Sequence, residues 1–254
     1  MLEVRDLSKA FGRAYAVDRV SFAIRPGEIL GYLGPNGSGK STTVKMLTGL
    51  LVPTSGQILY NGSDIRDDPE DFKSRLGYVP EEPYLYPYLT GREFLQMVGR
   101  LRQLPDRTVA GRADSLLHLF GLDAARHSTI SSYSKGMRQK VLISAALLSD
   151  PELLIFDEPL SGLDVTSALV FRSLVQMLVG AGKTVLYSSH VLDVVEKLCT
   201  RVLILRKGRV VADDSVERLR DLMSLPSLED VFSQLAVQED TGQVARDILA
   251  AMHA

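Results

Sequence analysis

The sequence predicts an α/β fold in which a largely helical segment, at about residues 83–148, is inserted into a core of strands and helices. Three observations lead to this prediction. Residues 34–42 fit the pattern G-x-x-x-x-G-K-[ST], between an apolar strand at 29–33 and a segment whose apolar residues have helical spacing. Continuous apolar runs at 153–156 and 185–187 are typical of buried parallel strands. Between about 83 and 148 the spacing is mainly helical.

The remaining elements follow from short local signals. Strands are predicted at 4–7, 20–25, 57–60 and 75–79, with turns at 26–27 and 61–62. A helix is predicted at 165–179, and a closing hairpin at 202–205 and 210–211. The tail from about residue 215 is predicted to be helical, because residues 227–230 have the form of a capping box.

Composition narrows the class of protein. The formal net charge of the 254 residues is −2 and no block of like charges stands out, so we expect no nucleic-acid partner. The single cysteine, Cys199, cannot form an internal disulfide, which indicates a reducing cytosol. We expect no signal peptide from residues 1–6, and no apolar run approaches the ~18 residues that span a bilayer, so we expect any membrane association to depend on a partner.

The glycine-rich stretch predicts binding of a nucleoside triphosphate. We expect Gly34, Gly37 and Gly39 to take positive φ angles and to turn backbone N–H groups toward phosphates. Lys40 supplies a charge for the β- and γ-phosphates, and the Ser41 hydroxyl can coordinate Mg²⁺. The alternative, a plain glycine-rich turn, is disfavoured by the strand before and the helix after. The whole predicted loop comprises Gly34, Asn36, Gly37, Ser38, Gly39, Lys40, Ser41 and Thr42.

Two carboxylates and a histidine follow buried strands. Asp157 and Glu158 come directly after the strand at 153–156, and His190 follows the strand at 185–187. Ligands in α/β sheets bind at the carboxyl ends of strands, where the phosphate loop also lies. We therefore expect one carboxylate to hold Mg²⁺ and the other to act as general base for a water. The alternatives are an acidic helix cap and a structural histidine.

The loop at residues 131–139 and the aromatic pair Phe11 and Tyr15 each allow two interpretations from physical reasoning alone. Residues 131–139 form a small-residue loop before a helix, which is either a simple cap or a second anion site. Phe11 and Tyr15 lie in a polar stretch. Either aromatic ring could stack on adenine, or both could be half-buried loop residues.

The order of these motifs resembles the ATP-binding cassette (ABC) family over about residues 2–220. The resemblance includes the phosphate loop, the run from 153 to Pro159 with its Asp and Glu, the loop 161–164, and Ser188-Ser189-His190. It implies a P-loop NTPase (RecA-like) mixed sheet with an antiparallel β subdomain and an inserted helical subdomain. It favours Phe11 over Tyr15 as the adenine-stacking residue. It assigns catalysis to Lys40, Glu158 and His190, metal binding to Ser41, Glu81 and Asp157, and further nucleotide contacts to Phe11, Glu81, Ser134, Gly136 and Asp164.

Two positions depart from the family pattern. The signature, usually Leu-Ser-Gly-Gly-Gln, is residues 133–137 with Lys135 in place of a glycine, and the usual Q-loop glutamine is Glu81. Both departures, and the tail at 227–232, resemble the exporter-like branch of the family. Glu81 can still offer an oxygen to Mg²⁺, but it adds negative charge near the γ-phosphate.

The resemblance implies a transport function. Two cassettes, identical or different, would close on two ATP molecules with Mg²⁺ and drive export through a separate transmembrane permease. That partner would dock near Glu81 and the helical segment, which places the protein in the cytoplasm on the inner face of the cell membrane. Residues 1–220 would form the nucleotide-binding domain and 221–254 a helical extension. The alternatives are a soluble non-transport ABC ATPase and a regulatory ATP-binding cassette.

Overall fold

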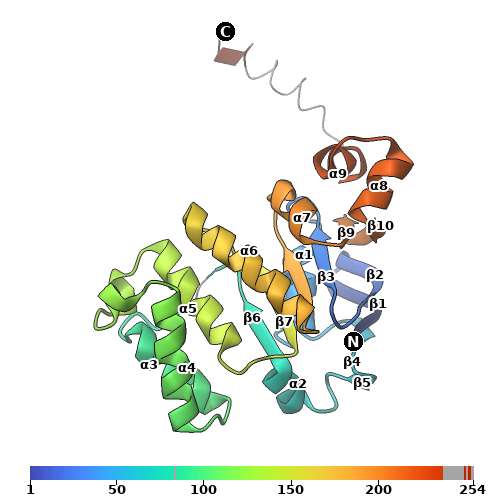
Figure 1. Ribbon diagram of the computed structural model, residues 1–254. Helices are drawn as coiled ribbons and strands as arrows, with labels where there is room; N and C mark the ends of the chain where they lie inside the picture. The colour runs from blue at the N-terminus through green and yellow to red at the C-terminus, as the bar shows by residue number, and fades with distance from the viewer. Residues whose placement is uncertain (83, 237–248, 250, 253–254) are drawn as a thin grey trace.

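The computed structural model of the chain describes residues 1–82, 84–236, 249 and 251–252 (Figure 1). Its centre is a six-stranded sheet in the order β10-β9-β3-β8-β7-β6. All neighbouring pairs from β9 to β6 are parallel, and only β10 is antiparallel to its neighbour. The strands are β3 (Ile29–Leu33), β6 (Leu76–Val79), β7 (Leu153–Asp157), β8 (Thr184–Ser188), β9 (Arg201–Arg206) and β10 (Arg209–Ser215).

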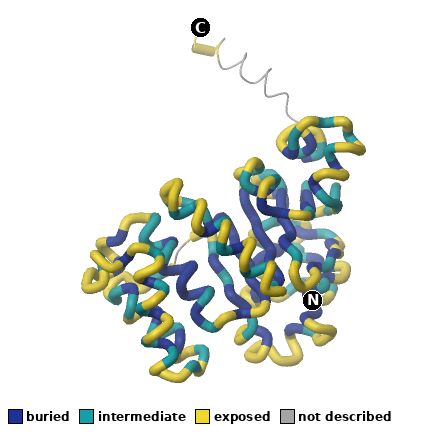
Figure 2. The backbone as a smooth tube through the Cα atoms, in the orientation of Figure 1, coloured by how far each residue is buried: buried dark blue, intermediate teal, exposed yellow. Residues whose placement is uncertain are grey.

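The parallel strands are buried on both faces, which explains their continuous apolar runs. In β7, Leu153 and Ile155 pack into one hydrophobic cluster, and Leu154 and Phe156 pack into the cluster on the other side. Figure 2 shows these central strands as a buried layer. The α/β fold predicted from the sequence is confirmed.

A second, antiparallel sheet has the order β2-β1-β4-β5. It consists of β1 (Leu2–Phe11), β2 (Ala14–Ile24), β4 (Ser55–Tyr60) and β5 (Ser63–Asp64). The first two strands extend well beyond the predicted 4–7 and 20–25. The tip of their hairpin, at Phe11, Ala14 and Tyr15, is exposed, and the residues added at this end show no regular alternation of apolar and polar side chains. The predicted turn at 61–62 does join β4 to β5.

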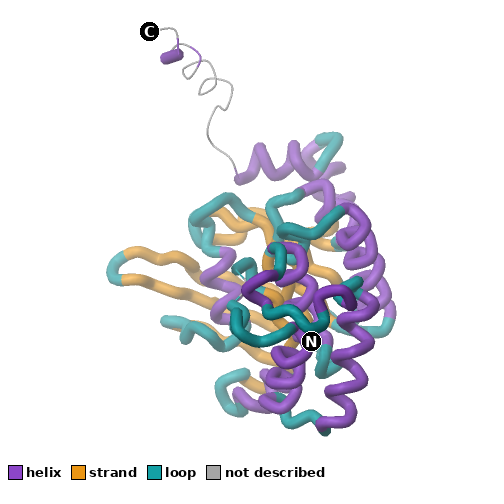
Figure 3. Tube along the Cα trace, turned by 90° about the vertical axis from the view of Figure 1, so that its left-hand side faces the viewer, coloured by secondary structure: helices purple, strands orange, loops and turns teal. Residues whose placement is uncertain are grey.

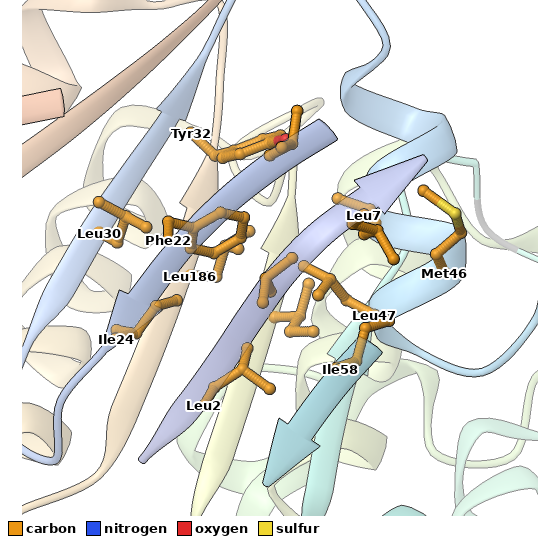
Figure 4. Close-up of a cluster of buried hydrophobic side chains, with 14 of the residues drawn as sticks. Leu2, Leu7, Phe22, Ile24, Leu30, Tyr32, Met46, Leu47, Ile58 and Leu186 are labelled. Atoms are coloured by element: carbon orange, nitrogen blue, oxygen red, sulfur yellow. The ribbon is translucent and has the colours of Figure 1, made fainter. Parts of the chain in front are cut away.

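One face of the parallel sheet packs against α1 (Lys40–Leu47), α2 (Pro69–Arg75) and the antiparallel sheet. Figure 4 shows this core, where Leu30 and Tyr32 of β3 lie near Phe22 and Ile24 of β2. Helix α2 was not predicted, because Phe72 is its only buried residue and no apolar period marks it.

The other face is covered by α5 (Lys135–Leu147), α6 (Val165–Gly180), α7 (Leu192–Leu198), α8 (Val216–Met223) and α9 (Leu228–Ala236). In Figure 3 most helices stack on one side of the strands. Glu196 of α7 accepts hydrogen bonds from Arg220 of α8 (3.0 Å) and from the Leu228 amide (3.1 Å). The helical tail is thereby fixed to α7.

The inserted segment contains α3 (Gly91–Leu101), α4 (Asp106–Leu119), two short 3₁₀ turns (Asp123–Ala125 and Ile130–Ser132) and α5. These helices lie together at one side of the molecule (Figure 1) and share a separate cluster around Leu95, Ala113 and Val141. Helix α5 belongs to both cores, since Ile143 and Ala146 face the sheet cluster. The end of the helical subdomain at about residue 148 and the end of the nucleotide-binding domain at residue 220 stay predictions. Of the predicted helical extension at 221–254, most residues after 236 lie outside the described residues.

Among the described residues, no helix is both long enough and apolar enough to span a bilayer.

Close packing at β6 generates a stability prediction. A Cβ atom on Gly77 would lie 2.6 Å from the Ala146 carbonyl oxygen and 2.8 Å from side-chain atoms of Leu154 and Pro151. We expect Gly77→Ala to lower the free energy of unfolding by about 1–3 kcal/mol, as measured by urea denaturation. Gly111→Ala, on the exposed side of α4 with nothing within 4 Å, is the control and should be neutral or stabilising. Equal stabilities for the two variants would contradict this account of the packing.

Candidate active site

The phosphate loop connects β3 to α1. Gly37 and Gly39 have φ angles of +75° and +105°, as predicted. The prediction for Gly34 is wrong, because it is not among the residues with positive φ. It is needed for space instead: a Cβ atom there would lie 2.6 Å from the Leu205 carbonyl oxygen and would collide with the Ser38 hydroxyl.

Lys40, the first residue of α1, closes over this loop. Its Nζ donates to the carbonyl oxygens of Gly34 (2.5 Å) and Pro35 (3.2 Å). Burial lowers the pKa of Lys40, while the carboxylates of Glu158 and Asp157 oppose the shift. The lysine ammonium is therefore bound to the loop and lies close enough to the two carboxylates for their charges to act on it.

Asp157 and Glu158 lie where β7 ends beside β8, and both are buried. The pKa of Asp157 is raised to about 6, mainly by burial and also by the neighbouring carboxylates of Glu81 and Glu158, which outweigh the lowering by a Ser188 hydrogen bond and the Lys40 charge. Glu158 has a φ angle of +50°, uncommon outside glycine, and its amide donates to the Ser188 carbonyl oxygen at 2.9 Å.

The Glu158 carboxylate is held at both oxygens. His190 Nδ1 lies 2.9 Å from Oε1, and the Ser189 hydroxyl donates to Oε2 at 3.2 Å. The His190 side chain is 78% exposed, whereas that of Glu158 is 11% exposed. His190 therefore bridges the buried carboxylate and the open side of the site.

A cavity of about 630 Å³ joins these groups. It is lined by Ala16, Asn36, Gly37, Gly39, Lys40, Ser41, Thr42, Glu81, Asp157, Glu158 and His190. Sequence reasoning missed Ala16, an alanine at a register shift in β2 that carries no chemical signal. Gly34 and Ser38 do not line this cavity; Ser38 is buried and lies against Gly34 within the loop.

The other predicted residues lie outside the cavity wall. Ser134 caps α5 by accepting from the Met137 amide at 3.2 Å, and a Cβ atom on Gly136 would collide with the Gly162 carbonyl oxygen. Asp164 caps α6, and hydrogen bonds from Ser167 lower its pKa to about 2. Ser134 is therefore held at the start of its own helix and Gly136 is packed against the 161–164 loop, and neither residue lines the cavity of its own chain.

Phe11 and Tyr15 occupy the β1–β2 hairpin and are 56% and 58% exposed. Phe11 pairs with Ala14 and Tyr15 with Ala10, which puts the two rings on opposite faces of the ribbon. At most one of them can face a given nucleotide. Neither lines the cavity.

The oxygen atoms of Ser41, Glu81 and Asp157 are of the kind that Mg²⁺ prefers. In the described part of the chain, no three His, Cys, Asp or Glu residues are grouped closely enough to hold a metal alone. This donor set fits an ion that takes its remaining ligands from phosphates and water, as Mg²⁺ commonly does.

The burial of Asp157 predicts a pH-dependent stability in protein free of metal and nucleotide. Its folded pKa of about 6 exceeds the ordinary value of 3.8 for an aspartate in the unfolded chain, so folding favours the protonated acid. The stabilisation of the folded state by protonated Asp157 is fully present below about pH 3.8 and is lost as the pH rises through 6. We expect Asp157→Asn to raise the free energy of unfolding by about 1–3 kcal/mol at pH 7.5, and by much less at pH 4.5. Urea denaturation at both pH values measures this, and an equal gain at both would contradict it.

Comparison with known proteins identifies the family. Residues 17–161 match the model of the ABC transporter family. The chain is 37% identical over 243 residues to the ABC transporter ATP-binding protein NatA of Bacillus subtilis, covering 94% of this chain and 99% of NatA. It is 42% identical over 201 residues to an uncharacterised ABC transporter ATP-binding protein of Nostoc, of which it covers 59%. It is also 34% identical over 221 residues to the Nod factor export ATP-binding protein I of Cupriavidus metallidurans, covering 87% and 73% of the two chains.

Solved structures agree with this assignment. The structure of an ATP-binding subunit of an ABC transporter superimposes with a TM-score of 0.87 at 35% identity, covering 92% of this chain and 99% of that one. A dimeric, post-hydrolysis state of the cassette MJ0796 bound to ADP and Pi superimposes with a TM-score of 0.77 at 25% identity, covering 85% and 98%. The chain belongs to the ABC transporter family as an ATP-binding subunit, and its enzymatic activity is the hydrolysis of ATP.

Proposed function

We propose that this subunit drives export through a separate transmembrane permease, and that two cassettes close on two ATP molecules to do so. One observation carries the proposal: Lys40, Asp157, Glu158 and His190 line one cavity, while Ser134 and Gly136 lie outside it. A second cassette that presents these two residues would complete the nucleotide site. The dimeric, ADP- and Pi-bound state of MJ0796 supports such an arrangement.

The residues of the cavity take distinct roles in this proposal. The loop amides and Lys40 bind the phosphates, and Phe11 stacks on adenine. Ser41, Glu81 and Asp157 hold Mg²⁺, whose chemistry is to neutralise phosphate charge. Asp157 is suited to this role, because the Lys40 charge only partly neutralises its buried carboxylate and Mg²⁺ would complete the neutralisation.

Glu158 acts as the general base. It takes a proton from a water as the water oxygen bonds to the γ-phosphorus, and the bond from that phosphorus to the ADP oxygen breaks with its electron pair on ADP. The products are ADP and inorganic phosphate. His190 lies at 2.9 Å from Glu158 with an exposed ring, so it can contact the base in the free site and turn toward a γ-phosphate when ATP binds.

The permease would dock beside the cavity, on the surface that follows Glu81. Tyr84, Tyr86 and Tyr88 are 83%, 60% and 87% exposed, which is unusual for three aromatic residues in one short segment. This segment is tied to the loop before the signature, since the Pro87 carbonyl accepts from Ser131 at 2.9 Å. A displacement of this segment by a partner would be transmitted through this backbone hydrogen bond to the signature at residues 133–137.

Export and location rest on the relatives. The Nod factor export protein matches over 87% of this chain, and a probable multidrug ABC transporter ATP-binding protein of Escherichia coli, YbhF, is a further relative. A subunit that contacts the permease from the side of ATP would lie at the cytoplasmic face of the membrane.

Glu158→Gln tests the general base. The variant should bind ATP with unchanged affinity, because the substitution keeps the size of the side chain, and should hydrolyse it about 10²–10⁴-fold more slowly, the usual contribution of a general base. Phosphate release and a fluorescent-nucleotide titration measure the two quantities. A variant with near-normal turnover would remove Glu158 from this role.

The contrasting variant is Lys40→Ala. Loss of the loop charge should weaken ATP binding itself, and unchanged affinity would contradict the assignment of Lys40.

Co-purification tests the transport proposal. Tagged protein isolated from detergent-solubilised membranes should bring along a stoichiometric polytopic membrane protein, identified by mass spectrometry. Recovery of soluble partners or ribosomal proteins alone would overturn the transport proposal and leave the ATPase activity in place.

A further inference from the structure

We propose that Ser189 is a positioning residue for ATP hydrolysis, whose hydroxyl holds the Glu158 carboxylate in the orientation that accepts a proton from water. This inference rests on the proposed role of Glu158 as general base. Ser189 does not line the cavity and touches no nucleotide in this arrangement, so its effect would pass entirely through Glu158.

The hydroxyl of Ser189 has a defined direction. It is 3% exposed, and its oxygen accepts a hydrogen bond from the Val191 amide at 3.1 Å. A serine hydroxyl has one proton to donate, and Oε2 of Glu158 lies 3.2 Å away as acceptor. Because the residue is buried, water does not compete for either contact.

The backbone of the base is already fixed on both sides. The Glu158 amide donates to the Ser188 carbonyl at 2.9 Å, and the carbonyl of the next residue, Pro159, accepts from the buried Gln139 side chain at 3.0 Å. The remaining freedom of Glu158 is rotation of its side chain. Ser189 and His190 restrict that rotation, one at each carboxylate oxygen.

The contacts of His190 and Ser189 with Glu158 differ in how easily a bound ligand can break them. The His190 side chain is 78% exposed on the open side of the site, where an incoming phosphate can draw it away. Ser189 is buried beneath Glu158 and cannot follow a ligand. When His190 engages the γ-phosphate, Ser189 is therefore the side-chain contact that still orients the base.

The test is Ser189→Ala in the full chain. We expect kcat for ATP to fall about 10- to 100-fold, because a hydrogen bond to a charged group and the aim of the base are lost together. KM for ATP should stay within about twofold, since no nucleotide contact is removed. Ser189→Thr, which keeps the hydroxyl, should recover most of the lost kcat.

Ser144→Ala is the matched control. Ser144 is another fully buried serine, and its hydroxyl donates to the Lys140 carbonyl within α5, away from the cavity. Removing it should leave kcat within about twofold of the original value. Thermal unfolding of each variant shows whether the fold is retained.

A double-mutant cycle separates positioning from a general structural effect. In the Glu158→Gln background, Ser189→Ala should reduce single-turnover hydrolysis by less than about twofold, because the base that Ser189 orients is already gone. An equal loss in both backgrounds, or an unchanged kcat for Ser189→Ala alone, would overturn the inference. Near-normal turnover by Glu158→Gln itself would instead overturn the proposed role of Glu158, so the two failures are distinguishable.

Discussion

The arrangement of the site depends on one steric constraint, the meeting of three backbone segments at the phosphate loop. A Cβ atom on Gly39 would collide with the carbonyl oxygen of Ala16 in β2, and one on Gly208 would lie 2.8 Å from that same oxygen. The Gly208 amide also donates to the Ser38 carbonyl at 2.9 Å, and its carbonyl accepts from Asp18 at 2.8 Å. The loop, the β9–β10 turn and the antiparallel sheet therefore hold one another in place, and side chains at these glycines would separate them.

The same architecture accounts for the electrostatics of the site. Parallel strands that are buried on both faces bring the residues at their carboxyl ends to one edge of the sheet. Asp157 ends β7 there, beside Ser188 of β8, in surroundings poor in water. The charged form of its carboxylate is consequently disfavoured, and Lys40 only partly compensates, as the raised pKa of Asp157 shows. A site built in this way has a deficit of positive charge, which the Mg²⁺ of the proposed function would supply.

The success of sequence reasoning followed from the kind of signal available. The strand at 29–33 and the cavity residues Lys40, Asp157 and Glu158 were predictable, because apolar runs and polar residues at strand ends are local patterns. Ala16 was not, since backbone proximity leaves no trace in the type of side chain. Gly34 does belong to the loop, but the reason predicted for it, a positive φ angle, is wrong. A glycine is needed there because the Leu205 carbonyl lies close by, and such proximity of backbone segments cannot be read from the sequence.

Helix α5 connects the inserted segment to the loop that carries Glu158. Its buried Gln139 donates to the Pro159 carbonyl at 3.0 Å, next to Glu158, and at its first turn Gly136 packs on the Gly162 carbonyl with no room for a side chain. The same helix contributes to the core of the inserted segment and to the core of the sheet. A shift of α5 must therefore displace the 158–164 segment or break these contacts. The helix that presents the signature residues Ser134 and Gly136 is thus mechanically joined to the loop that carries Glu158, the proposed base.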